Sequence, residues 1–147
     1  MNEGLLRELG AELSARRRQV SHEPVTFAVL GYHLAGTWAA TVSLESALIS
    51  DDDRAIRQAL SAIAARILIA LHDLDVPWAL RTPQHYRGRY RSGADLTQRL
   101  RMRLAEVWKY LILAPEKDAV IALELALKEC FELASTLDFD LLLELSA

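Results

Sequence analysis

The sequence predicts an all-α fold. Apolar residues recur at three- and four-residue intervals through most of the chain, and no segment alternates apolar and polar residues for long enough to form a strand. Hydrophobic residues make up 52% of the 147 residues and charged residues 25%, which excludes disordered and collagen-like chains. We therefore expect a single all-α domain over residues 1–147, a bundle of four long helices in two αα-hairpins with a short N-terminal helix.

The first half of the chain contains three expected helices. The short N-terminal helix ends near residues 16–18 and places Leu6, Leu9 and Leu13 on one face. A second helix runs from about Pro24 to Ile49, because proline is well tolerated at the first helical position. Ser50 is the expected N-cap of a third helix, which ends before Pro77. Its apolar face consists of Ile56, Leu60, Ile63, Ile67, Leu71 and Leu74.

Two further long helices and a short one are expected in the second half. The fourth helix begins at Asp95, with Gln98 in a capping-box position, and its apolar face consists of Leu96, Leu100, Leu104, Val107 and Leu111. Pro115 begins the fifth helix, with Val120, Leu123, Leu127, Phe131 and Ala134 on its apolar face. A short terminal helix covers residues 141–145. The connection 76–94 between the third and fourth helices is long, and long loops without structure of their own are usually functional or disordered.

Compartment and membrane association are predicted from the N-terminus, the cysteine content and one uncharged run. No basic segment followed by an apolar stretch marks a secretory signal, and the single Cys130 excludes a disulfide framework. Residues 24–44 carry no formal charge and are long enough to cross a bilayer, but the run contains several polar side chains and lacks basic flanks. We therefore expect a cytoplasmic protein without a membrane span, in which this run is a central, mostly buried helix.

Positive charge is concentrated in residues 81–103. This segment holds seven arginines and one acidic residue, a net charge of +6, whereas residues 1–80 carry −3 and residues 104–147 carry −6. Arginine binds phosphate or carboxylate through two parallel hydrogen bonds, and tyrosine offers a ring on which a base or guanidinium stacks. The segment predicts docking of an anionic partner by Arg81, Tyr86, Arg87, Arg89, Tyr90, Arg91, Arg99 and Arg103.

The source of the negative charge stays open at this point. An acidic protein surface, a nucleic acid or nucleotide phosphate, and the acidic fifth helix of the same or another subunit, with Glu124, Glu129 and Glu132, all fit. The overall net charge of −3 disfavours general coating of nucleic acid. Docking of an outside partner requires that carboxylates of the same chain do not already neutralise the arginines. The high apolar fraction also favours a homodimer.

Polar side chains recur every four residues along the second helix and form one ridge: His33, Thr37, Thr41 and Glu45. One interpretation is a hydrogen-bonded seam that fixes helix register, with threonines bonding to carbonyls one turn earlier. The alternative is a polar pocket with Glu45 as base or ligand anchor and His33 as a second titrating group. The candidate partners of Glu45 are then Arg66, His33, Arg99 and Arg103. We favour the seam.

Residues 49–78 resemble the second half of the MazG-like nucleotide pyrophosphohydrolases, in an acidic turn followed by a helix and then Leu74-Asp75-Val76. The resemblance implies magnesium ligands in an E-E-x-x-E motif and a later E-x-x-D motif. This chain has no adjacent glutamates and no E-x-x-D, and only Glu129 and Glu132 have carboxylates at i, i+3 spacing. Magnesium therefore lacks its oxygen ligands, and we expect no metal and no cofactor.

The pair Arg66 and His72 resembles the R-x4–6-H spacing of the all-helical HEPN ribonucleases. Six positions along a helix correspond to a rotation of about 240°, so the two side chains need not share a face. Glu124, Lys128 and Glu132 form an expected solvated ionic ladder. With no catalytic residue assigned, the sequence predicts a non-catalytic helical interaction protein. A nucleic-acid or nucleotide-phosphate binder and a small hydrolase or sensor built on the polar pocket remain as alternatives.

Overall fold

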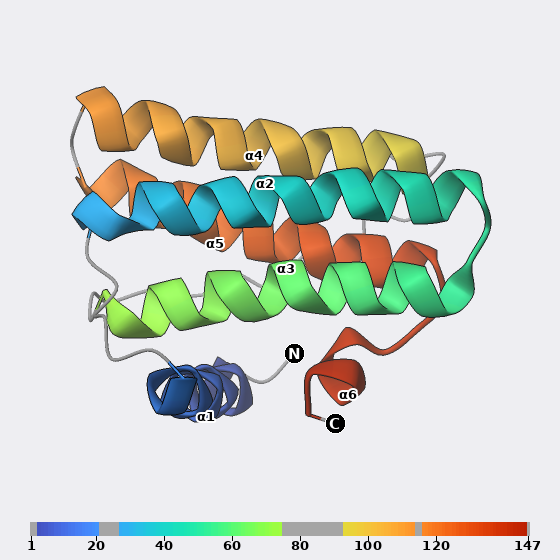
Figure 1. The fold of residues 1–147 in the computed structure, drawn as a ribbon, viewed down its shortest axis with the longest axis horizontal. Helices are drawn as coiled ribbons and strands as arrows, with labels where there is room; N and C mark the ends of the chain where they lie inside the picture. The colour runs from blue at the N-terminus through green and yellow to red at the C-terminus, as the bar shows by residue number, and fades with distance from the viewer. Residues whose placement is uncertain (1–2, 21–26, 75–92, 114–115, 147) are drawn as a thin grey trace.

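The computed structural model describes residues 3–20, 27–74, 93–113 and 116–146 (Figure 1). These residues form six helices and no strand, which confirms the all-α prediction. The predicted connection lies almost wholly outside the described residues. The helices are α1 (Glu3–Val20), α2 (Phe27–Ile49), α3 (Asp53–Asp73), α4 (Gly93–Leu113), α5 (Glu116–Thr136) and α6 (Leu141–Ser146).

The four long helices α2–α5 lie side by side (Figure 1). Helix α3 packs against α2 and α5, and α4 packs against the same two helices from the other side. Helices α2 and α3 run in opposite directions, and so do α4 and α5 (Figure 1). Helix α1 crosses α3 on the outside of this group, and α6 also contacts α3. Helix α3 therefore contacts four other elements and is the central helix of the fold.

The buried core follows the apolar faces that the sequence predicts. Every residue of the predicted α3 face is buried except Leu74, which is partly buried against the core. Of the predicted α4 and α5 faces, Leu100, Leu104, Val107, Leu123 and Leu127 are buried, and Phe131 is partly buried. Helix α3 is also the one helix of the described residues that is long and apolar enough to span a membrane, and half of its most apolar stretch is buried within the molecule.

The expectation that the uncharged run forms the central, mostly buried helix is wrong for the described part of α2. On this helix Trp38 is 38% exposed, Val42 54% and Ile49 81%. Absence of charge does not require burial, because alanine, serine and threonine are accepted at the surface. Helix α2 therefore packs on α3 and α4 with one side and leaves a side with apolar residues and the half-exposed Glu45 toward solvent.

The turn between α2 and α3 differs from its prediction. Asp52, not Ser50, is the N-cap of α3: the Asp52 carboxylate accepts a hydrogen bond from the Ala55 N–H at 3.2 Å. The Ser50 hydroxyl instead donates to the carbonyl of Ser46 at 3.0 Å, at the end of α2. Between them Asp51 adopts φ 53°, in the left-handed region that favours glycine.

Helices α1 and α6 are attached to α3 by specific polar contacts. The buried Ser14 hydroxyl of α1 donates to the carboxylate of Asp73 at the end of α3. At the other end of α3, Arg57 Nη1 lies 3.0 Å from Glu144 Oε1 of α6, and the guanidinium carbon lies 5.1 Å from the centre of the Phe139 ring. Helix α1 also continues to Val20, beyond its predicted end.

Candidate functional site

Six of the eight predicted anion-binding residues lie outside the described residues: Arg81, Tyr86, Arg87, Arg89, Tyr90 and Arg91. Their role stays a prediction. The other two, Arg99 and Arg103, lie on α4 together with Arg101, the remaining arginine of the basic segment.

Arg101 joins α4 to α2 through two contacts. Its Nη1 lies 2.6 Å from Glu45 Oε2, and its Nε donates to the Thr41 hydroxyl at 3.0 Å. The Thr41 hydroxyl in turn donates to the Trp38 carbonyl at 2.6 Å, one turn earlier on α2. A hydroxyl can donate once and accept at the same time, so both interactions are made together.

Arg101 was not among the partners that the sequence suggested for Glu45. The signal was available in the helical periodicity of α4, where Thr97, Arg101 and Leu104 share one side at intervals of four and three residues. Thr97 and Leu104 are buried, so this side of α4 faces the rest of the fold. A charged side chain on such a face needs a partner on the opposing helix.

The polar ridge of α2 is part of this helix contact. Thr37 and Thr41 are buried, whereas the Glu45 side chain is 51% exposed and pairs with Arg101. Arg66 lies elsewhere: its guanidinium lies against α2 at Gly36, where an added Cβ would clash with Arg66 Nη1. Nine residues separate Gly36 from Glu45, about 13 Å along a helix. The structure therefore does not bring Arg66 to Glu45, and the side chain of His33 lies outside the description.

Arg103 joins α4 to α5. Its Nε lies 3.7 Å from Glu129 Oε1 on α5, and its Nη1 lies 3.3 Å from Glu106 Oε2 on α4 itself. Arg99 is close enough to α5 for its charge to lower the pKa of Glu132. Burial and the charge of Glu129 raise this pKa by more. The described arginines of the basic segment thus face carboxylates of their own chain.

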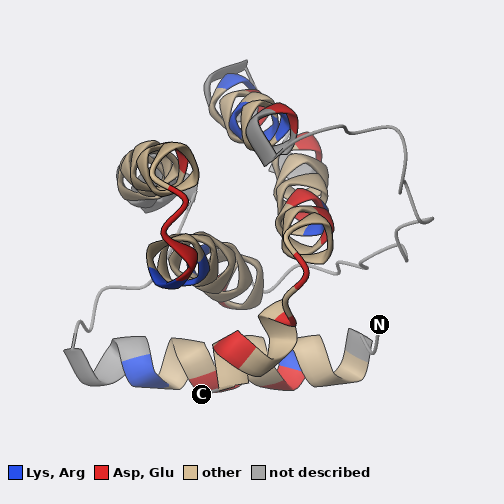
Figure 2. Cartoon of the chain, turned by 90° about the vertical axis from the view of Figure 1, so that its right-hand side faces the viewer, with Lys and Arg blue, Asp and Glu red and all other residues tan. Residues whose placement is uncertain are grey.

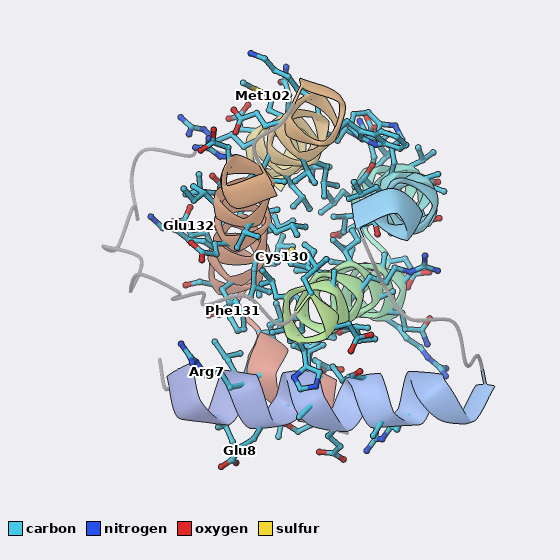
Figure 3. The ribbon with its side chains drawn as sticks, turned by 90° about the vertical axis from the view of Figure 1, so that its left-hand side faces the viewer. Arg7, Glu8, Met102, Cys130, Phe131 and Glu132 are labelled. Atoms are coloured by element: carbon cyan, nitrogen blue, oxygen red, sulfur yellow. The ribbon has the colours of Figure 1, made fainter. Side chains whose placement is uncertain are left out.

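Two carboxyl groups of α5 are nearly removed from water. The side chain of Glu129 is 6% exposed and that of Glu132 is 10% exposed. Burial, followed by the negative charge of Glu129, raises the pKa of Glu132 to about 7. The prediction that Lys128 and Glu132 belong to a solvated ladder is therefore wrong, because the Lys128 side chain is only 18% exposed. Figure 3 shows Glu132 on the side of α5 that is turned away from α2.

Cys130 lies between these two glutamates in the chain but points into the core (Figure 3). Burial raises the pKa of its thiol far above the ordinary value, so this thiol stays protonated. The side chain therefore acts as a small apolar group of the core, as the sequence predicts.

A surface with exposed apolar side chains and few charges extends along α2 and onto α4, and we call it the α2–α4 outer face. On α2 it includes the exposed residues Trp38, Val42 and Ile49, and on α4 it includes Met102 and Ala105. Figure 2 shows α2 almost without charged residues, and Figure 3 shows Met102 pointing away from the core. Large apolar side chains exposed together on one side are typical of an interaction surface.

Comparison of the chain with protein-family models, with curated proteins and with solved structures gave no match. Within the part of the chain that the structure describes, no three His, Cys, Asp or Glu side chains converge on a position for a metal ion.

Proposed function

We propose that this chain is a non-catalytic helical interaction protein that forms a homodimer through the α2–α4 outer face. One observation carries the proposal: Trp38, Val42 and Ile49 are exposed on a helix whose only carboxylate, Glu45, is paired with Arg101. Removing such a face from water is favourable, and no unpaired charge has to be buried with it.

A second copy of this chain suits the face because Glu45 on the face is paired with Arg101, so the face does not carry charges of one sign. A two-fold axis places the same residues of both copies opposite one another, so a face of one charge sign repels its own copy. The surface also has to be large enough. A helix of 23 residues is about 35 Å long and about 10 Å wide, less area than the roughly 800 Å² that each partner buries in a standard interface. The proposed interface therefore includes Met102 and Ala105 of α4.

The test is the mass in solution, measured by light scattering at tens of micromolar protein. We expect a dimer for the natural chain and a monomer with unchanged helix content for Val42→Glu. Ser43→Glu is the matched control, since Ser43 is exposed on the same helix but on the side away from α4, and it should stay dimeric. A monomeric natural chain, or a Val42→Glu variant that stays dimeric, contradicts the proposal.

The Arg/Tyr-rich segment 81–103 supplies the second part of the proposed function, docking of an anionic partner. This segment spans most of the long connection 76–94 and the start of α4. The proposal places it between two αα-hairpins of a cytoplasmic protein. Because Arg101 and Arg103 pair with Glu45 and Glu129, this proposal assigns the contact with the partner to residues 81–91.

Binding of poly-glutamate and of single- and double-stranded DNA at several salt concentrations tests this docking. Affinity should fall with rising salt, and Arg87→Ala should weaken binding and flatten its salt dependence. Arg54→Ala is the control: Arg54 is exposed on α3, so its removal should change neither the affinity nor the salt dependence. Preference for DNA supports the nucleic-acid alternative over an acidic protein. No retention of any of these probes at low salt removes both.

The hydrolase or sensor alternative gains no support from the geometry, because Glu45 faces Arg101 and not Arg66. A Glu45→Gln variant that changes only the stability fits the seam between α2 and α4. If the natural chain hydrolyses a substrate and the folded Glu45→Gln variant does not, the polar pocket is favoured instead.

A further inference from the structure

Two buried carboxylate oxygens of α5 have no hydrogen-bond donor. They are Oε2 of Glu129 and Oε1 of Glu132, one from each carboxyl group. An ionised carboxylate can only accept hydrogen bonds, and a buried acceptor without a donor is costly to folding. Because Glu129 and Glu132 lie one turn apart on α5, the two groups are neighbours on one side of this helix.

One proton resolves both unsatisfied oxygens. A protonated carboxyl group carries one O–H, which donates to the oxygen of the other carboxylate. The side chains of Glu129 and Glu132 are within hydrogen-bonding reach of each other, and this contact contributes to the raised pKa of Glu132. Carboxyl groups that share a site in this way give up the second proton reluctantly.

The charged groups around the pair do not supply the missing donors. On α4, Arg103 is divided between Glu129 and Glu106, and the charge of Arg99 lowers the pKa of Glu132 while Oε1 of Glu132 stays without a donor. On α5 itself, Lys128 Nζ lies 4.0 Å from Glu132 Oε1, beyond hydrogen-bond distance. Helix α3 packs on α5 as part of the apolar core. The two carboxyl groups therefore depend on each other.

We propose that Glu129 and Glu132 share one proton in the folded protein and form a pH-sensitive contact between α4 and α5. Above neutral pH this proton passes to water, and two adjacent carboxylates remain at the edge of the helix pair. Their repulsion displaces Glu132 toward solvent and opens the buried contact at this edge of α4 and α5. The α4–α5 pair is then looser at alkaline pH than at mildly acidic pH, while α1 and α2 are unaffected.

The sign of the pH dependence follows from proton binding. The folded protein keeps a proton that the unfolded chain has lost above the ordinary glutamate pKa of 4.5. The free energy of unfolding therefore falls as the pH rises from about 4.5 toward about 7, and the stabilisation is absent above that range. Carboxylates with lowered pKa values give the opposite trend, so the two cases are distinguishable.

Direct titration tests the shared proton without any substitution. In the natural chain, carbon-detected NMR of the glutamate side-chain carboxyl groups should show the Glu132 resonance titrating near neutral pH. If all glutamates titrate in their ordinary range, the pair shares no proton and the proposal is overturned.

Thermal unfolding between pH 5.5 and pH 8.5 tests the consequence. The natural chain should lose several degrees of melting temperature as the pH rises, whereas Glu132→Gln should lose much less, because the glutamine N–H donates permanently to Glu129. Glu12→Gln, at an exposed position of α1, removes the same charge and should keep the natural pH dependence. Equal pH dependence in all three proteins contradicts the proposal.

Amide hydrogen exchange, corrected for the intrinsic effect of pH, locates the change. Amides of α4 and α5 in the natural chain should exchange several-fold faster at pH 8.5 than at pH 6, and those of α2 should not. In Glu132→Gln this difference should disappear. A uniform change over the whole chain would show a general loss of stability and would overturn the assignment to the α4–α5 contact.

Discussion

The hydroxyl group of Thr41 shows how one small side chain connects two helices. It donates to the Trp38 carbonyl within α2 and accepts from Arg101 of α4, while the residue is fully buried. A valine of the same shape would leave Arg101 Nε without this acceptor. The hydroxyl therefore fixes the register of α2 against α4, as the seam interpretation of the polar ridge expects.

Asp51 carries local backbone strain that can be tested by substitution. Its positive φ costs about 1 kcal/mol for a residue with a Cβ atom, and glycine avoids this cost. We expect Asp51→Gly to raise the free energy of unfolding by about 0.5–1 kcal/mol in urea denaturation. Asp51→Ala keeps the Cβ atom and should give no such gain, so an equal gain from both variants would assign the effect to the lost charge.

At the scale of whole elements, hydrophobicity alone suggests α2 as the central helix, but α3 has this position. The run without charges lies at the edge, and the helix with charged residues at intervals lies at the centre. Arginines such as Arg57 keep their charged ends at the rim of α3 while the helix buries its apolar face. Element position therefore depends on which faces meet, and not on mean hydropathy.

Helix α6 is held on α3 by Arg57, and its attachment should depend on this side chain. The hydrogen bond with Glu144 and the charge of Asp53 both raise the pKa of Arg57, so its charge persists at every accessible pH. We expect Arg57→Gln to speed amide exchange in residues 141–146. Arg54→Gln, which removes an equal charge on the exposed side of α3, is the control and should leave α6 unchanged. Equal exchange in both variants would show that burial of Leu141 and Leu145 is enough to hold α6 on α3.

At the scale of the whole molecule, one apolar core joins all six helices of the described residues. Leu68 of α3 is fully buried in this core. Leu68→Ala should lower the free energy of unfolding by about 3–4 kcal/mol, because it removes apolar contacts and leaves a cavity. Ile121→Ala on the exposed side of α5 should change it by less than about 1 kcal/mol. Urea denaturation measures both, and a small effect at Leu68 would mean that the helices unfold separately.

Charge is segregated along the sequence but compensated in space. Arg101 and Arg103 come from the basic segment, and their partners Glu45 and Glu129 come from the acidic segments on either side. The condition for docking by these two arginines is therefore not met, which leaves residues 81–91 as the part of the segment that the docking proposal needs.

The sequence by itself determined the all-α class, the helices and most of the core, because these follow from the local spacing of apolar residues along 3.6-residue turns. It also indicated the unusual i, i+3 spacing of Glu129 and Glu132. Turn details such as the Asp52 cap were missed, because adjacent polar residues compete equally well for a cap.

Only the tertiary structure decided which polar groups meet. The pairing of Arg101 with Glu45 joins residues far apart in the chain and depends on which helix lies beside α2 and in which register. Helix neighbours and register also decide that Glu129 and Glu132 are buried and that Trp38 is exposed. Periodicity identifies the apolar face of each helix, but the neighbours of the remaining faces are set by the packing of all helices together.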